Sequence, residues 1–296
     1  MNKFSITCLA AAGFAVCATA ACAAAPVPPN WEPIITRPGA LAKGSGHVQG
    51  FCVTSNAIYA TLHDGIYKFD WYGRLLMHVA AEKHTGDICF WSGRLYTAVC
   101  IPVRDIPERG RIDVWDENLK RIDSTRFQRS ADGIACLDGV LYVGLGPVAD
   151  PQKPYRGNWF GKFDAQTLKP LCEPFVVDHG YDVCAGVQNI ATDGERLYVN
   201  FYTPEEDYPC FFVFDRDFNV LGAHVFGWRH GLDVVGGAEP GAMRFIYGLT
   251  LNCWSKAAKQ HVDPALSQNL FRYAELKDGA IADVTRYIKF EKEKRR

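Results

Sequence analysis

The sequence lacks the charge pattern that a nucleic-acid partner requires. Its 296 residues carry 32 Lys and Arg against 33 Asp and Glu, a formal net charge of −1. The basic residues form no patch-like run, and the terminal EKEKRR (291–296) is interpreted as a solvated, charged end. Because phosphate binding needs clustered Lys and Arg, no nucleic-acid partner is expected.

Several chemical motifs are also missing. The chain has no Gly-rich phosphate loop, no Gly-x-Ser-x-Gly and no His-Glu-x-x-His, which disfavours three common enzyme classes. Its 11 cysteines contain no Cys-x-x-Cys pair, which argues against a cysteine-based zinc site. Clear helical periodicity is scarce, so the chain is expected to be all-β.

The N-terminus has the pattern of an export signal. Lys3 is followed by an apolar, Ala-rich run and by the small-x-small site Ala21-Cys22-Ala23. We expect residues 1–23 to be a signal peptide of a periplasmic or extracellular protein, with a lipid anchor at Cys22 as the alternative. The run is too short and too Ala-rich for a transmembrane segment, and no other segment could span a bilayer. Residues 24–46 are predicted to form a Pro-rich, extended lead-in.

Eight cysteines remain after the signal. Cys52, Cys89 and Cys136 sit inside apolar segments, where a thiol behaves as a small hydrophobic group. Cys172 and Cys184 flank one loop, and they are interpreted either as a disulfide or as two thiols.

An internal repeat organises the rest of the chain. Each copy holds four polar or small residues, an apolar strand, a tight turn, a Leu-Tyr pair, a loop, an aromatic-Asp pair and a second turn. The copies begin at His47, His84, Ser130, Gly186 and His230. Units of this length with four short strands are typical of β-propellers. We therefore predict five blades of four antiparallel strands over residues 47–290, with six blades as the alternative.

The repeat resembles the secreted propellers of the broad NHL, SMP-30 and plant-type glutaminyl cyclotransferase groups. The segments HVQG (47–50) and GVQNIATDGERLY (186–198) are similar to the cyclotransferases. The resemblance implies the propeller fold. The acidic catalytic motif of the cyclotransferases has no recognisable counterpart, so their activity is not transferred to this chain.

The two faces of the predicted propeller differ. On one face the turns are short, as at Ser92-Gly93 and Asp138-Gly139, which suits a scaffold. On the other face the second-to-third loops are long: 101–110, 145–159, 203–209 and 252–268. Long loops on one side of a rigid scaffold often carry function. The candidate ligand-binding residues of this face are Arg109, Arg156, Trp159 and Trp254, a mixture that would suit a sugar, or the loops have drifted without a ligand.

The first strands begin on the long-loop face, so their four-residue starts are expected to ring the channel mouth. His47, His84 and His230 then fall on neighbouring blades and could hold Zn²⁺, or another divalent metal such as Ca²⁺, in the channel. Without a metal, a histidine such as His84 could act with Asp87, Asp132 or Asp233 as general base and orienter. Gln49, Gln188 and Asn189 are the ligand-binding candidates of the mouth. Alternatively, all of these groups simply line a wet channel.

Other motifs have simpler interpretations. The repeated aromatic-Asp pairs at Asp70, Asp116, Asp164 and Asp215 are expected to cap turns. His63-Asp64-Gly65 is interpreted as a turn, and the acidic 205–207 segment as a solvated loop tip or a Ca²⁺ ligand set.

The sequence therefore predicts an exported propeller that binds a small polar molecule, with a carbohydrate as the first choice. Hydrolase or lyase activity would fit the same residues. The alternative is a non-enzymatic binding or interaction scaffold of the cell envelope. No feature of the sequence indicates an oligomeric state.

Overall fold

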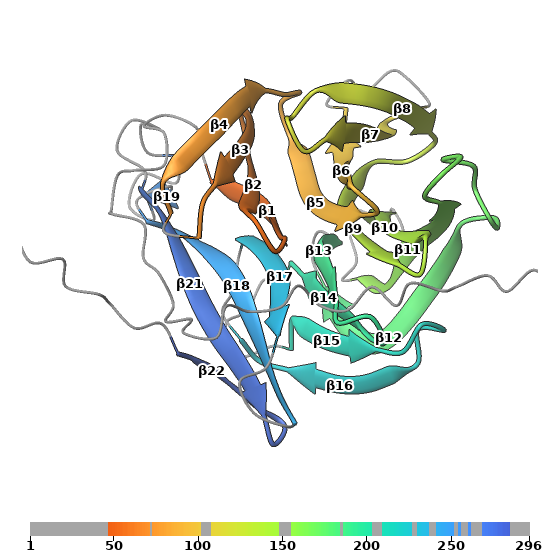
Figure 1. The fold of residues 1–296 in the computed structure, drawn as a ribbon. Helices are drawn as coiled ribbons and strands as arrows, with labels where there is room; N and C mark the ends of the chain where they lie inside the picture. The colour runs from red at the N-terminus through yellow and green to blue at the C-terminus, as the bar shows by residue number, and fades with distance from the viewer. Residues whose placement is uncertain are drawn as a thin grey trace, which may run out of the picture.

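The structure is a computed structural model. It describes residues 47–71, 73–101, 108–147, 155–183, 186–202, 209–226, 230–236, 241–251, 254–255, 260–261 and 268–284, and within these the side chains of 147, 155–156, 182–183 and 249–270 lie outside the description. The described chain folds into five four-stranded antiparallel sheets arranged around an axis (Figure 1). The predicted fold, an all-β propeller with five blades, is confirmed.

Each blade is built from consecutive strands. Blades 1 to 3 contain β1 (Val48–Val53), β2 (Ile58–Leu62), β3 (Gly65–Phe69), β4 (Leu75–Ala80), β5 (Thr85–Trp91), β6 (Arg94–Cys100), β7 (Gly110–Asp116), β8 (Arg121–Phe127), β9 (Ala131–Leu137), β10 (Val140–Pro147), β11 (Tyr155–Asp164) and β12 (Phe175–Val183). Blades 4 and 5 contain β13 (Val187–Thr192), β14 (Leu197–Phe201), β15 (Phe211–Phe214), β16 (Val220–His224), β17 (His230–Gly236), β18 (Ala242–Leu251), β21 (Gln268–Lys277) and β22 (Ala280–Asp283). A separate two-stranded sheet joins β19 (Trp254–Ser255) to β20 (Gln260–His261).

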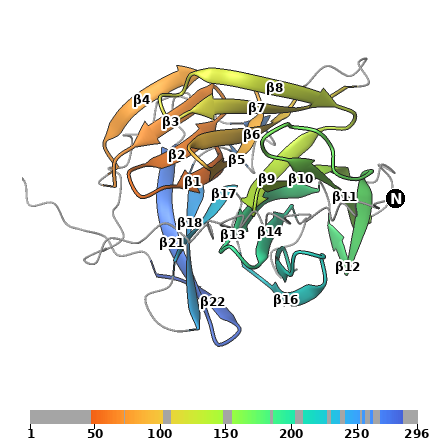
Figure 2. The ribbon, with the colours of Figure 1, turned by 45° about the vertical axis from the view of Figure 1, so that its right-hand side comes forward.

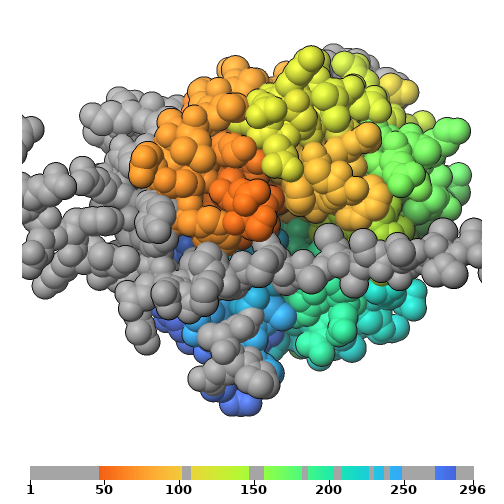
Figure 3. Space-filling view, viewed as in Figure 1, coloured from red at the N-terminus to blue at the C-terminus, as the bar shows by residue number. Residues whose placement is uncertain are grey.

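The first strand of every blade faces the axis. Strands β1, β5, β9, β13 and β17 contact one another in that order, and β17 closes the ring against β1. The outer strands β4, β8, β12, β16 and β22 lie at the rim in both ribbon views (Figures 1 and 2). In the space-filling view the described blades follow one another from orange through yellow and green to blue (Figure 3).

Burial follows strand position. All six residues of β1 are buried, whereas β4 and β8 are mostly exposed. An inner strand packs against neighbouring blades on both faces, so it tolerates a continuous apolar run. The hairpin turns hold Ser92 and Gly93, and Asp138 and Gly139, all at positive φ, as two-residue turns between twisted strands require.

The predicted aspartate caps are confirmed. In each of four blades one carboxylate oxygen of the aromatic-Asp pair accepts one or two backbone N–H groups of the following turn. For Asp116 the donors are Asn118 and Lys120, both at 2.9 Å. Hydrogen bonds lower the pKa of two of these groups: the backbone N–H and hydroxyl of Thr167 act on Asp164, and the side-chain amide and backbone N–H of Asn219 act on Asp215. These residues are therefore part of the scaffold and not of a catalytic site.

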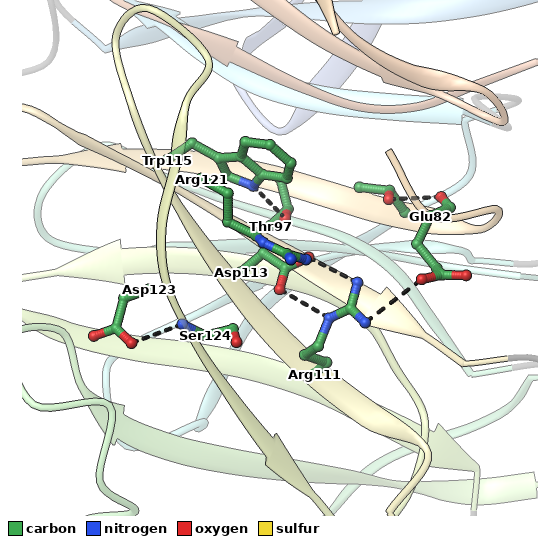
Figure 4. A network of polar contacts seen from close by, with 9 residues as sticks. Glu82, Thr97, Arg111, Asp113, Trp115, Arg121, Asp123 and Ser124 are labelled. Carbon is green, nitrogen blue, oxygen red and sulfur yellow. Dashed lines mark hydrogen bonds and ion pairs between the residues drawn. The ribbon is translucent and has the colours of Figure 1, made fainter. Parts of the chain in front are cut away.

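Polar contacts join successive blades. The hydroxyl of Tyr96 in blade 2 donates to the backbone oxygen of Ala165 in blade 3, at 3.0 Å. Between blades 1 and 2, Arg111 lies between the carboxylates of Glu82 and Asp113, at 3.5 and 2.8 Å (Figure 4). Asp113 and Arg111 are buried in β7, and Arg111 thereby connects this strand to Glu82 in the segment between blades 1 and 2.

Several predictions fall on residues outside the described ranges. The signal peptide, the lead-in, the lipid-anchor alternative at Cys22 and the charged end at 291–296 belong to this group, and they stay predictions. Cys172 is an exposed thiol, and Cys184 lies outside the description. Within the described residues, no helix has the length and apolar character needed to cross a bilayer.

Candidate functional site

A β-bulge interrupts the start of each of the five first strands. The register shifts lie between Val48 and Gly50, between Thr85 and Ile88, between Ala131 and Ile134, between Val187 and Asn189, and between His230 and Leu232. A bulge adds a residue to one strand and redirects its side chains, and bulges are common beside functional sites. Here five bulges surround one end of the channel, which we call the mouth.

Glycines let the first strands approach one another at the bulges. A Cβ atom added at Gly50 would lie 2.5 Å from the Cα atom of Asp87, and one added at Gly86 would lie 2.5 Å from the backbone oxygen of Asp132. Gly133 and Gly231 are similarly crowded by the next blade, and Gly231 also has a positive φ of 63°. The glycines at the starts of these strands therefore allow close packing between blades.

Four histidines form a row at the mouth. The ring centroids of His230 and His47 lie 4.3 Å apart, those of His47 and His63 lie 4.3 Å apart, and those of His63 and His84 lie 5.0 Å apart. The row thus runs from blade 5 across blade 1 to blade 2. The predicted grouping of His47, His84 and His230 is present, but His63 joins His84 to the other two.

His63 is the member that the sequence analysis missed. It had been interpreted as a turn residue, and it does follow β2 directly. Since Leu62 pairs with Val48 in the antiparallel register, the residue after β2 lies beside the residue before β1, which is His47. A strand-pairing argument on the sequence would therefore have placed His63 in the cluster.

Amide side chains close the channel below the histidines. Gln188 Nε2 of blade 4 donates to Gln49 Oε1 of blade 1 at 3.2 Å, and Asn189 Nδ2 donates to the backbone oxygen of Gln49 at 2.5 Å. Gln49 Nε2 lies 2.9 Å from His47 Nε2. With the amide in this orientation, Gln49 Nε2 donates and His47 Nε2 accepts, which is the arrangement of an imidazole that carries its proton on Nδ1. The three predicted ligand-binding residues Gln49, Gln188 and Asn189 are thus brought together.

Asp132 lies at the mouth on the side of blade 3. It is half-buried, and burial raises its pKa to about 6. Burial raises the pKa of the Cys100 thiol, and the nearby Asp132 carboxyl group raises it further. Arg109 and Ser130 lower the same pKa. These four groups therefore lie close together. Of the three aspartates predicted to act with a histidine, Asp132 is the one that lies half-buried at the mouth.

A cation–π contact flanks this group. The guanidinium carbon of Arg129 lies 4.0 Å from the ring centroid of the half-buried Trp159, and Arg129 has a positive φ of 75°. Trp159 is one of the predicted ligand-binding residues. Arg156 lies in β11 and Trp254 in β19, and the side chains of both are outside the description, as is most of each long loop.

Asp87 occupies a structural position. It is fully buried, and its Oδ2 accepts the backbone N–H of Ile190 at 2.8 Å and of Ile134 at 3.3 Å. One carboxyl group of blade 2 thereby ties blades 3 and 4. Burial raises its pKa well above the usual value, and the hydrogen bonds oppose the rise. Its predicted catalytic role would require exposure at the mouth, and this buried carboxyl group has none.

Asp233 lies away from the mouth. Its Oδ2 accepts the N–H of Val53, at the far end of β1, at 2.6 Å, and its Oδ1 accepts the N–H of Val234 at 2.8 Å. Together with Cys52 and Cys89 it lines a cavity at the short-turn end of the channel. His84 and Asp233 are therefore at opposite ends, and they do not form the predicted catalytic pair.

The predicted metal site does not fit the arrangement of the side chains. Within the described residues, no three His, Cys, Asp or Glu side chains are placed to hold one metal ion. His47, His84 and His230 lie along a row, whereas a metal needs donors directed at one point. The function proposed below therefore does not involve a metal ion at these histidines.

The chain matches no protein-family model and no curated protein. Solved structures do match its fold. A glutaminyl cyclase from Myxococcus xanthus is 13% identical over 82% of this chain and 98% of that chain, with a TM-score of 0.52. A GH43_1 enzyme from Xanthomonas citri is 15% identical over 83% of this chain and 94% of that chain, with a TM-score of 0.51. At such identities the likeness concerns the fold alone.

Proposed function

We propose that this protein is an exported propeller that binds a small polar molecule at the channel mouth, and that a carbohydrate is the first class to test. One observation carries the proposal. Four imidazoles from three blades gather beside an amide floor and the half-buried carboxyl group of Asp132. Three of these imidazoles are half-buried and that of His84 is exposed, so the side chains of the row are accessible to a ligand at the mouth.

The chemistry of the mouth suits a hydroxylated ligand. Amide, imidazole and carboxyl groups both donate and accept hydrogen bonds. A fold relative, the Xanthomonas citri GH43_1 enzyme, has been solved in complex with xylotriose, so the fold holds a sugar in that protein. Hydrolase or lyase activity is the finer part of the proposal. Asp132, with a pKa of about 6, would be the acid and a mouth histidine the base.

The binding test is a calorimetric screen of neutral sugars, uronic acids and short oligosaccharides against the purified protein. We expect at least one sugar to bind, and the affinity to fall roughly tenfold or more in Asp132→Asn and His63→Gln. The control is His224→Gln, on the outer strand β16. If a sugar binds equally well to all of these variants, the mouth is not its site.

Activity has a separate readout. Hydrolysis adds water across a glycosidic bond, whereas elimination breaks the C–O bond and leaves an unsaturated sugar. Mass spectrometry of the products therefore distinguishes the two reactions. Binding without turnover in either assay would remove the enzymatic part of the proposal and leave the binding part.

A non-enzymatic interaction scaffold is the second candidate. Its support is the outer strand β4, where the consecutive side chains of Leu75, Leu76 and Met77 are exposed. Adjacent exposed apolar residues often mark a protein contact. Replacing all three with Ser should weaken retention in the envelope fraction while leaving sugar binding intact. Unchanged retention would argue against this second function.

A further inference from the structure

The channel ends opposite the mouth in a cavity of about 280 Å³. We call it the turn-side cavity. All five first strands contribute to its lining, together with short turns of blades 1, 2 and 4. Its chemically distinctive lining residues are Cys52, Cys89, Cys136, Asp233, Glu117 and Phe90. The short turns of this face predict only a scaffold. The volume of the cavity nevertheless approaches that of small-molecule pockets.

The charge of the lining has one sign. Asp233 and Glu117 are acidic, and none of the described residues that line the cavity is Lys, Arg or His. The nearby Lys68 Nζ donates to the backbone oxygen of Glu117 at 2.9 Å, and it is not among the lining residues. A cavity with acidic groups and low-dielectric walls concentrates cations.

Asp233 is held in place while remaining accessible. Each carboxylate oxygen accepts one backbone N–H, from Val53 and Val234, which leaves further lone pairs for a ligand. The residue lies in an inner strand but is only half-buried, as are Cys89 and Phe90. Because these three residues lie next to the axis and line the cavity, their exposed surface faces the cavity.

The remaining walls suit an organic cation. Phe90 supplies an aromatic ring, and a cation over the face of such a ring is attracted by the ring electrons. The thiols of Cys52, Cys89 and Cys136 supply soft, polarisable contacts. Burial keeps the pKa of Cys89 well above its usual value, so this thiol stays neutral and does not act as a metal-binding thiolate.

We propose that the turn-side cavity is a second binding site, separate from the mouth, for a small organic ammonium ion. The ammonium group pairs with the Asp233 carboxylate, the alkyl part contacts Phe90 and the thiols, and Glu117 adds negative charge at the rim. This site does not depend on the function proposed for the mouth.

The first test is calorimetric titration of the protein with butylammonium, butyrate and butan-1-ol, which share one alkyl chain and differ in charge. It is run at pH 8, because burial raises the pKa of Asp233 to about 7 and the carboxyl group must be ionised. We expect butylammonium to bind at least about tenfold more tightly than butan-1-ol, and butyrate to bind more weakly than either.

The second test uses variants in the same titration. In Asp233→Asn combined with Glu117→Gln, the preference for butylammonium should be lost, whereas Glu195→Gln, an exposed acid outside the lining, should retain it. Asp233→Asn keeps an acceptor oxygen for the Val53 N–H but not for that of Val234, so circular dichroism checks that the variant is folded. Equal affinities for butylammonium and butan-1-ol in the parent protein, or a preference that survives in the folded double variant, would each overturn the proposal, and sugar binding at the mouth would be unaffected.

Discussion

At the scale of single residues, the buried carboxyl groups of the channel have separate roles. Asp87 and Asp233 both accept backbone N–H groups from neighbouring blades, whereas no such bond is made by Asp132 among the described contacts. A carboxylate that satisfies buried backbone donors stabilises the fold. Of the three, Asp132 is therefore the one available to a ligand at the mouth, whereas Asp233 faces the turn-side cavity.

The role of Asp87 gives a stability prediction. Asp87→Ala leaves the buried N–H groups of Ile134 and Ile190 without this acceptor, at a cost of about 1–3 kcal/mol each. Asp87→Asn keeps an acceptor and should lose about 1 kcal/mol. Urea unfolding measures both changes, with Asp132→Ala as the control, which should stay close to the parent. An Asp87→Ala protein as stable as the parent would refute the structural role.

Asp233 gives a prediction about pH. Burial raises its pKa from 3.8 to about 7, so between these values the folded state binds a proton that the unfolded state has lost. The free energy of unfolding must then fall as pH rises from about 4 to about 7. Each unit of difference between the folded and unfolded pKa is worth about 1.4 kcal/mol. The free energy of unfolding therefore falls by at most about 4 kcal/mol over this range.

The measurement compares unfolding of the parent and of Asp233→Asn across this pH range. The difference between the two proteins isolates Asp233 from other groups, such as His224, whose pKa burial lowers. The variant should lose less stability between pH 4 and pH 7. If the two curves run parallel, Asp233 does not change its protonation in this window.

At the scale of the strand, the bulged starts combine two requirements. They bring polar side chains to the mouth, and their glycines let adjacent blades touch. Gly50 shows the second requirement most clearly, because an added Cβ atom would meet the backbone of Asp87 at 2.5 Å. A flexible side chain could move away from such a contact, but backbone cannot.

Gly50→Ala should therefore destabilise the protein by about 1–3 kcal/mol through overpacking. The matched control is Gly93→Ala, in a turn where nothing lies within 4 Å of the added atom. Because Gly93 has a positive φ of 79°, its substitution should cost about 1 kcal/mol. Thermal unfolding of both variants tests the comparison, and a smaller loss at Gly50 than at Gly93 would contradict the packing account.

Strand periodicity and turn chemistry made the blades predictable from the sequence. The aspartate caps were equally clear, because a motif that repeats in each blade answers a structural need. Side-chain destinations across the channel were harder to predict. Asp87 and Asp233 are each the last of the four residues that start a first strand. Asp87 nevertheless accepts hydrogen bonds from blades 3 and 4, whereas Asp233 faces the turn-side cavity. Bulges change the alternation of side chains, and the sequence pattern does not reveal them.

At the scale of the whole molecule, the channel has two chemically different ends. The mouth carries imidazoles, amides and one carboxyl group, while the turn-side cavity is acidic and lined by thiols. The hydrogen bonds of Gln49, Gln188 and Asn189 lie between them. Ligands at the two ends are therefore expected to bind independently.

Export remains to be tested on the intact chain. The sequence predicts that the mature protein begins near residue 24, after removal of residues 1–23. Intact-mass measurement of protein from its natural host should show this loss. A mass increased by lipid, with Cys22 as the first residue, would support the anchored alternative, and an uncleaved N-terminus would contradict export.

The most direct test of the central claim, that the histidine-lined mouth is the ligand site, is an NMR titration of the histidine ring resonances. Of the eight histidines, His47, His63, His84 and His230 form the mouth, whereas His78 and His224 lie on the outer strands β4 and β16. A bound sugar from the screen should shift the four mouth resonances and leave those of His78 and His224 in place. A sugar that binds while the mouth resonances stay unchanged would contradict the account.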